Sequence, residues 1–337
     1  MKNPTTFKDL LYQEIAKHNK HHDPNTGRFT YAPGGSQKQK SAARKFQEKA
    51  RTTRQYGSTG CGDAVAEIAG GRTNSLDGHL DKNGNLTPER EALHKEIIDN
   101  WLAEKMPAQG KPQMRMLGGG PAAGKSSVAN GGLVAQMDGV SDVTVNPDDF
   151  KEMLPGYSDM ASKTDKAASH YHEESSALAK RAYEVALNEG YNVVYDGTGD
   201  GSVKSVEKKI KAARDKGYEV NGVYVTVDTE EAVIRSDQRY ESAKAKGQNP
   251  RRVPHDYIRS CHAKVTDISV ECAPMFDSIE IYDNNGPKGS TKLIAKGGNG
   301  QGLTAVDEPA FRNYLAKGSN GLDGFITLPN GQVIPVK

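Results

Sequence analysis

The sequence predicts an α/β protein in which a parallel β-sheet is sandwiched by helices. From residue 113 to 284, short apolar segments alternate with longer segments of helical periodicity. Strand and helix alternation of this kind is typical of a parallel sheet. Some apolar runs, such as Val193-Val194-Tyr195, are continuous, which indicates strands buried on both faces.

The first expected helix begins at Thr87-Pro88, where a hydroxyl cap precedes a proline at the first helical position. Its apolar face is formed by Leu93, Ile97, Ile98, Trp101 and Leu102. Strands are expected over residues 113–117, 143–145, 192–196, 222–227 and 278–282. Further helices are expected over residues 124–137, 162–188, 203–216, 230–246, 254–273 and 308–315.

Three parts follow from this organisation. Residues 1–85 are expected to form a basic, partly disordered extension, because they show little periodicity. Residues 86–289 form the α/β domain. Residues 290–337 are glycine-rich and contain one short helix, so we expect a loosely attached and poorly structured tail.

The octet Gly119-Gly120-Pro121-Ala122-Ala123-Gly124-Lys125-Ser126 fits the pattern G-x-x-x-x-G-K-[ST] of the phosphate-binding P-loop. It lies between an expected strand and an expected helix, as this loop requires. Its glycines let backbone N–H groups point inward, and the helix start adds partial positive charge. We expect residues 119–126 and Ser127 to bind the phosphates of ATP, with GTP left open. Lys125 supplies a point charge and Ser126 a hydroxyl ligand for Mg²⁺. A glycine-rich surface loop is the alternative.

Acidic residues follow two other expected strands. Asp148, in Asn146-Pro147-Asp148-Asp149, can accept a proton from an attacking hydroxyl. Asp196, in Asp196-Gly197-Thr198-Gly199, can organise Mg²⁺, and Thr198 offers a hydroxyl to a substrate. The alternatives are that Asp148 and Asp149 only cap a helix and that Asp196-Gly197 is an ordinary turn.

Arginines follow the fourth expected strand. Arg235 and Arg239 are four residues apart on one helix, and Arg251-Arg252 lie in a segment that contains glycine and proline. Guanidinium groups suit a transferring phosphoryl group, and this segment has the place of a mobile lid. A solvated basic face is the alternative.

The ordered set of motifs resembles the zeta-toxin kinases over residues 86–285. This resemblance implies a P-loop kinase that phosphorylates a sugar hydroxyl of UDP-N-acetylglucosamine, often as the toxic half of a toxin–antitoxin pair. It implies that Lys125 and Ser126 hold ATP and Mg²⁺ and that Asp148 is the base. Contacts to the acceptor and to the transferred charge are implied for Thr198, Glu173, Glu174, Arg252, Arg239 and Arg251. The two glutamates are the nearest acids upstream on the helix where the family carries its substrate-binding glutamate.

Charge, apolar segments and cysteine content indicate which binding partners and which cellular compartment to expect. The chain has 337 residues and a net charge of +2, yet residues 1–55 contain twelve Lys or Arg against four Asp or Glu. This segment could contact nucleic acid or another polyanion, or it could be a solubilising arm. No segment approaches the roughly 20 apolar residues of a membrane span. Three unpatterned cysteines favour a reducing cytoplasm.

The segment from His22 to Phe29 is similar to segments of phage head-associated proteins, which suggests a phage or prophage origin. The sequence thus predicts an ATP- and Mg²⁺-dependent kinase acting on a small-molecule hydroxyl, with an antitoxin as a candidate partner. The alternatives are a kinase for a nucleoside, a dinucleotide or a nucleic-acid end, and a non-enzymatic virion-associated protein.

Overall fold

The computed structural model describes residues 74–130, 142–199, 201–248, 250, 252–287, 290–318, 325–327 and 333–335. The chain divides into two units, Met1–Asp63 and Ala64–Lys337, and every described residue belongs to the second. The basic N-terminal segment and the phage-like segment from His22 to Phe29 lie outside the described residues.

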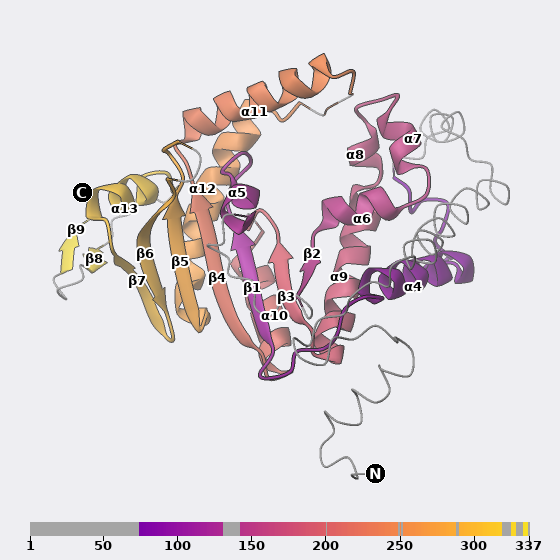
Figure 1. The fold of residues 1–337 in the computed structure, drawn as a ribbon, viewed down its shortest axis with the longest axis horizontal. Coiled ribbons are helices and arrows are strands. Elements are labelled where there is room, and N and C mark those ends of the chain that lie inside the picture. The colour runs from indigo at the N-terminus through magenta and orange to yellow at the C-terminus, as the bar shows by residue number, and fades with distance from the viewer. Residues whose placement is uncertain are drawn as a thin grey trace, which may run out of the picture. The chain divides into compact units, whose positions relative to one another are not determined.

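The described residues form a nine-stranded sheet in the order β2-β3-β1-β4-β5-β6-β7-β8-β9 (Figure 1). Its first five strands are parallel, as the sequence predicts. These are β1 (Gln113–Gly118), β2 (Asp142–Val145), β3 (Asn192–Asp196), β4 (Glu219–Thr226) and β5 (Ser278–Asp283). β1 lies between β3 and β4, so the carboxyl ends of the parallel strands meet at one edge, where ligands bind in sheets of this type.

Helices cover the sheet and stand around this edge. They are α4 (Pro88–Leu102), α5 (Lys125–Asn130), α6 (Pro147–Met153), α7 (Tyr157–Ala161), α8 (Ala167–His170), α9 (His172–Glu189), α10 (Val203–Arg214), α11 (Thr229–Ala245), α12 (His255–Cys272), the short 3-10 helix η1 (Ala273–Met275) and α13 (Glu308–Leu315). None of the described helices has the length and hydrophobicity needed to cross a membrane. In Figure 1, α11 and the group α6 to α8 stand on opposite sides of the parallel strand ends.

One expected helix is divided. The sequence predicts a single helix over residues 162–188, whereas α8 ends at His170 and α9 begins at His172. Between them, Tyr171 has φ −92° and ψ 1°. Its hydroxyl donates to Pro155 O at 3.0 Å, and its ring packs edge-on against Tyr157. These contacts with the preceding turn fix the break, and helical periodicity does not encode them.

The glycine-rich tail is partly an extension of the sheet. β6 (Lys292–Gly298) pairs antiparallel with β5, and β7 (Gln301–Ala305) pairs antiparallel with β6. Ile294 and Ala305 are fully buried, and Phe311 of α13 is almost so. The expectation of a loosely attached tail is therefore wrong for residues 292–315. A Cβ on Gly297 would lie 2.5 Å from Gly302 O, so this glycine serves the close approach of two strands. Beyond residue 318, the described part contains only β8 (Phe325–Thr327) and β9 (Val333–Pro335).

Most of the buried apolar side chains belong to one cluster that joins both faces of the sheet to the surrounding helices. A second cluster lies beside the loop that follows β1. It includes Ala123 and Val128 from the loop after β1, Val225 from β4 and Ile258 from α12. The loop that follows β1 is therefore packed against the body of the protein rather than lying on its surface.

Candidate active site

The P-loop connects the central strand β1 to α5. Gly119 and Gly124 have φ of +150° and +92°, the region that glycine adopts most readily. Lys125 Nζ donates to Gly119 O at 2.9 Å and so closes the loop on itself. This geometry, with packing on one side, contradicts the alternative of a plain glycine-rich surface loop.

Two residues from distant elements hold the loop. Asn284, just after β5, donates from Nδ2 to Ala123 O at 2.9 Å. His262 of α12 lies with Nε2 3.0 Å from Pro121 O. Burial lowers the pKa of His262, so the neutral ring donates its Nε2–H to this carbonyl. Both contacts use carbonyl oxygens of the loop. Sequence reasoning missed these residues, because neither belongs to a local motif.

The end of β3 lies directly beside the P-loop. Gly119 N donates to Thr198 O at 2.9 Å, which fixes the segment after β3 against the first residue of the loop. Asn146, at the end of β2, donates from Nδ2 to Asp196 Oδ2 at 3.3 Å. The structure therefore brings together Thr198, Asp196 and the P-loop, which the sequence places 70 or more residues apart.

Charge couples the acids at these strand ends. Burial raises the pKa of Asp196, Lys125 opposes this rise, and Asp149 and Asp148 add to it. Burial also raises the pKa of Asp149, with a further contribution from Asp148. Asp196 thus lies within electrostatic reach of two other carboxylates and of the P-loop lysine. A divalent cation or a polyphosphate with its cation would relieve this repulsion.

Asp148 lies in the first turn of α6 with its side chain 80% exposed. The cap of α6 is Asn146, whose Oδ1 accepts from Asp148 N at 2.9 Å. The alternative in which Asp148 caps this helix is therefore wrong, because its carboxylate does not accept from the first N–H groups of α6. Lys151, one turn further on, donates from Nζ to Asp148 Oδ1 at 2.6 Å.

Glu174 does not serve the role proposed from the resemblance. Its side chain is fully buried and receives Arg90 Nε at 2.5 Å and His94 Nε2 at 2.9 Å. Burial acts to raise the pKa of Glu174, but hydrogen bonds from His94 and Arg90 outweigh it and lower the pKa to about 2. This carboxylate joins α9 to α4, and its burial argues against contact with an acceptor. Glu173 is exposed and accepts from Asn74 Nδ2 at 3.1 Å.

The arginines after β4 have different settings. Arg235 pairs with Glu231 at 2.8 Å and donates to Asn284 O at 3.1 Å, so it supports the residue that holds the P-loop. Arg239 is exposed on α11. Arg252 lies 5.4 Å from the Tyr240 ring centroid, where its charge contacts the ring face. Arg251 and the side chain of Ser127 lie outside the described residues.

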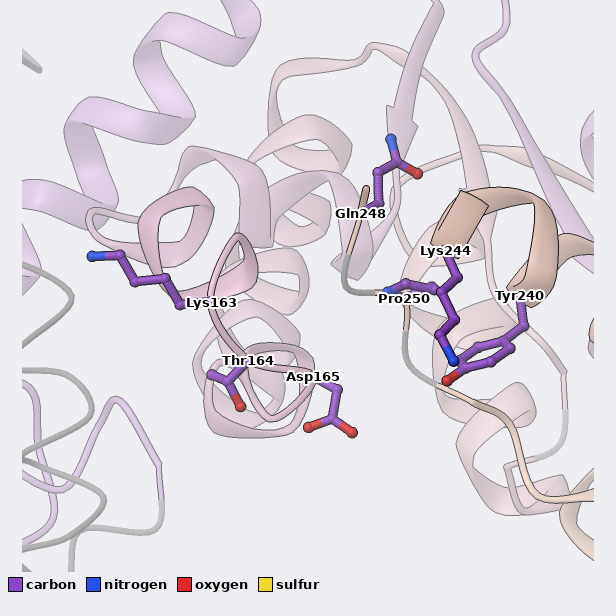
Figure 2. Close-up of a pocket in the computed structure, with 7 residues that line it drawn as sticks. All are labelled: Lys163, Thr164, Asp165, Tyr240, Lys244, Gln248 and Pro250. Atoms are coloured by element: carbon purple, nitrogen blue, oxygen red, sulfur yellow. The ribbon is translucent and has the colours of Figure 1, made fainter. Parts of the chain in front are cut away.

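A polar pocket of about 300 Å³ lies between the two groups of helices that flank the strand ends. Its walls come from the connection between α7 and α8 and from the end of α11 with the segment after it (Figure 2). The lining residues are Lys163, Thr164, Asp165, Tyr240, Lys244, Gln248 and Pro250. In Figure 2, Lys163 points away from Tyr240 and Lys244, whereas Asp165 lies on the side facing them.

The donor set suits Mg²⁺ held jointly with a nucleotide. Among the described residues, no group of three or more His, Cys, Asp or Glu side chains could hold a metal ion by itself. Mg²⁺ is usually bound by one or two carboxylates together with substrate phosphates and water. Ser126 at the start of α5 and Asp196 at the end of β3 supply oxygen ligands of this kind.

The strand order 2-3-1-4-5, the P-loop after the central strand and the acids at neighbouring strand ends define a protein of the P-loop kinase type. A family model described as Zeta toxin matches residues 98–295, more than half of the chain, and the chain belongs to this family. Family membership and fold make it a phosphotransferase of the kinase class. A comparison with curated proteins gives no match.

Solved structures share the fold at low identity. AvrRxo1-ORF1:-ORF2 with ATP is 21% identical, with 70% of this chain and 75% of that chain covered and a TM-score of 0.53. The same complex with sulphate ions gives the same values. A structure from the PezAT chromosomal toxin–antitoxin system of Streptococcus pneumoniae is 19% identical, covering 63% of this chain and 81% of that chain, with a TM-score of 0.49.

Proposed function

We propose that this protein transfers the γ-phosphoryl group of ATP to a hydroxyl of a sugar nucleotide such as UDP-N-acetylglucosamine. One observation carries the proposal: the P-loop lysine Lys125 and the acid Asp148 both lie within electrostatic reach of Asp196 at the carboxyl ends of the parallel strands. Family membership supports the choice of acceptor. The choice of donor is supported by the shared fold of AvrRxo1-ORF1:-ORF2, which was solved with ATP.

In this proposal, the backbone N–H groups of Gly120, Ala122 and Gly124 and the ammonium of Lys125 bind the triphosphate. Pro121 has no N–H, and those of Gly119 and Ala123 donate to Thr198 O and Gly120 O. Ser126 and Asp196 are the residues that would hold Mg²⁺. A bound Mg²⁺ withdraws charge from the phosphates and so eases the transfer. Lys125 donates to Gly119 O at 2.9 Å, so its ammonium lies beside the first residue of the loop.

Asp148 is proposed as the base. Its exposed carboxylate takes the proton of the acceptor hydroxyl while the new O–P bond forms and the bond between the β–γ bridging oxygen and the γ-phosphorus breaks, releasing ADP. Thr198 is proposed to contact the acceptor, and this role is supported by the position of its backbone beside Gly119. Arg239 and Arg251 are proposed to stabilise the transferred charge, and Arg252 and Glu173 to contact the acceptor. The polar pocket beside Tyr240 offers room for the remainder of that acceptor.

Phosphorylation tests the donor site directly. The protein is incubated with γ-labelled ATP, Mg²⁺ and UDP-N-acetylglucosamine, and the labelled product is separated and identified. Lys125→Ala should lower the rate by at least about a thousandfold, because it removes charge that stabilises the transferred group. Lys111→Ala, at an exposed lysine before β1, is the matched control and should leave the rate unchanged. An undiminished rate in Lys125→Ala would reject the P-loop as the donor site.

The same assay discriminates among acceptors. Product from a nucleoside or an oligonucleotide, with none from UDP-N-acetylglucosamine, would replace the sugar-nucleotide acceptor while keeping the kinase. We also propose a protein partner that blocks the site, because an enzyme consuming a sugar nucleotide would harm the cell that makes it. Growth arrest on expression of the wild type, absent with Lys125→Ala, is the expected sign of this harm to the cell.

A further inference from the structure

Lys151 of α6 is a buried lysine whose ammonium meets an exposed carboxylate. Its side chain is 7% exposed, and its Nζ lies 2.6 Å from Oδ1 of Asp148, which is 80% exposed. Two other lysine–aspartate pairs, on α4 and at the end of α10, have the same Nζ–Oδ distance of 2.6 Å. In these, Lys95–Asp99 and Lys211–Asp215, all four side chains are more than half exposed. Exposed pairs of this kind contribute little.

Burial of an ammonium is unfavourable unless a charged or hydrogen-bonding partner compensates for it. Among the described residues, Asp148 is the one hydrogen-bond and ion-pair partner of Lys151 Nζ. The buried aliphatic part of Lys151 therefore holds its ammonium against Oδ1 of Asp148. The next residue back, Phe150, is almost fully buried, and its ring centroid lies 5.4 Å from that of Trp101. The helix turn that carries Lys151 is thus anchored in the core.

Asp148 is consequently held at two points. Its backbone N–H donates to Asn146 Oδ1 at 2.9 Å, and its Oδ1 accepts from Lys151. No described residue forms a hydrogen bond or an ion pair with its second oxygen, Oδ2. Asn146 also contacts Asp196 at 3.3 Å, so this arrangement is joined to the end of β3 beside the P-loop.

We propose that Lys151 is the positioning residue for proton transfer at this site, holding Oδ1 of Asp148 so that Oδ2 faces the acceptor hydroxyl. This inference rests on the proposed function. The acceptor proton passes to Oδ2, and Lys151 keeps its own proton throughout.

A double-mutant cycle on the full chain tests the proposal, with γ-labelled ATP and UDP-N-acetylglucosamine as substrates. Lys151→Met keeps the buried stem but removes the charge. It should lower kcat by about tenfold or more and leave KM for ATP within about twofold. Asp148→Asn should lower kcat further. Adding Lys151→Met to Asp148→Asn should have no additional effect, since Lys151 acts through Asp148.

Two variants act as controls. Lys151→Arg, which restores a charge, should recover most of kcat. Lys95→Met removes an exposed pair of the same length on α4 and should leave kcat unchanged. If Lys151→Met does not fold, as judged by its thermal transition, Lys151→Gln takes its place in the cycle.

The outcomes separate this inference from the proposed function. If the wild type transfers phosphate but Lys151→Met has full kcat, or if its loss is equally large with and without Asp148→Asn, the positioning role is overturned and the kinase stands. If the wild type does not use UDP-N-acetylglucosamine, that acceptor is wrong. The same cycle is then run on ATP hydrolysis, where water replaces the acceptor. Absence of any ATP turnover in the wild type overturns both.

Discussion

Replacement of Glu174 by glutamine should destabilise the protein through loss of one buried charge. The Glu174 side chain is fully buried between Arg90 and His94, and its pKa falls from an ordinary value of 4.5 to about 2. At about 1.4 kcal/mol for each pH unit between these values, the ionised form contributes about 3 kcal/mol to stability. Arg90 would be left 11% exposed without its partner, a loss of the same order.

The contribution of Glu174 to the free energy of unfolding depends on pH. A carboxyl whose pKa is lowered on folding stabilises the protein above its unfolded value, and this stabilisation is lost as pH falls toward the folded value. We therefore expect Glu174→Gln to lower the free energy of unfolding by about 3 kcal/mol at pH 7, and the gap to wild type to be about 1 kcal/mol smaller at pH 3.5. Urea unfolding, followed by circular dichroism at several pH values, measures both quantities.

Glu91→Gln is the matched control, because Glu91 and Arg181 join the same two helices through a pair that is 53% and 33% exposed. An exposed pair contributes at most about 1 kcal/mol. The reasoning would be refuted if Glu174→Gln were no more destabilising than Glu91→Gln. It would also be refuted if the gap to wild type stayed constant down to pH 3.5, since the loss would then come from shape rather than charge.

Two further predictions concern the surroundings of the P-loop. Gly124→Ala should weaken ATP binding by at least about tenfold in calorimetry, because φ is +92° and a Cβ would lie 2.2 Å from Asn284 Nδ2; Gly110→Ala, where a Cβ meets nothing within 4 Å, should bind normally. Burial lowers the pKa of Lys317 from 10.5 to about 8. Between these pH values the unfolded chain binds more protons than the folded protein, so the free energy of unfolding of the wild type should rise with pH. Relative to Lys317→Met, the rise between pH 7 and pH 10 should be roughly 2 kcal/mol. Chemical unfolding at both pH values checks this, and parallel curves for the two proteins would contradict it.

The parts of the fold that depend on local chemistry could be predicted from the sequence. The Thr87-Pro88 start of α4 is confirmed, with Thr87 Oγ1 accepting from Arg90 N at 3.4 Å. The glycines of the P-loop, the strand before it and the acids after β2 and β3 were also found, because turn geometry and strand ends leave a local signature. The pair formed by Asp148 and Lys151 had a signal as well, since residues three apart on a helix are neighbours.

The parts that depend on distant contacts could not be predicted. His262 and Asn284 contact the P-loop across 141 and 161 residues of sequence, and no motif marks either one. The break at Tyr171 depends on Pro155 in the preceding turn. Glu174 was expected to contact the acceptor from its position along the expected helix. Its partner Arg90 lies 84 residues earlier, and sequence position alone gives no measure of burial.

The C-terminal extension supports the P-loop and not only the edge of the sheet. Lys317, after α13, donates to Thr226 Oγ1 and to Val227 O at the end of β4. Thr226 O accepts from Asn284 N at 2.8 Å, and Asn284 Nδ2 holds Ala123 O of the P-loop. A continuous set of hydrogen bonds therefore connects the segment after α13 with the backbone of the P-loop. Because the family match ends at residue 295, this support comes from a part of the chain that the match does not include, and the unit that holds the P-loop extends at least to Lys317.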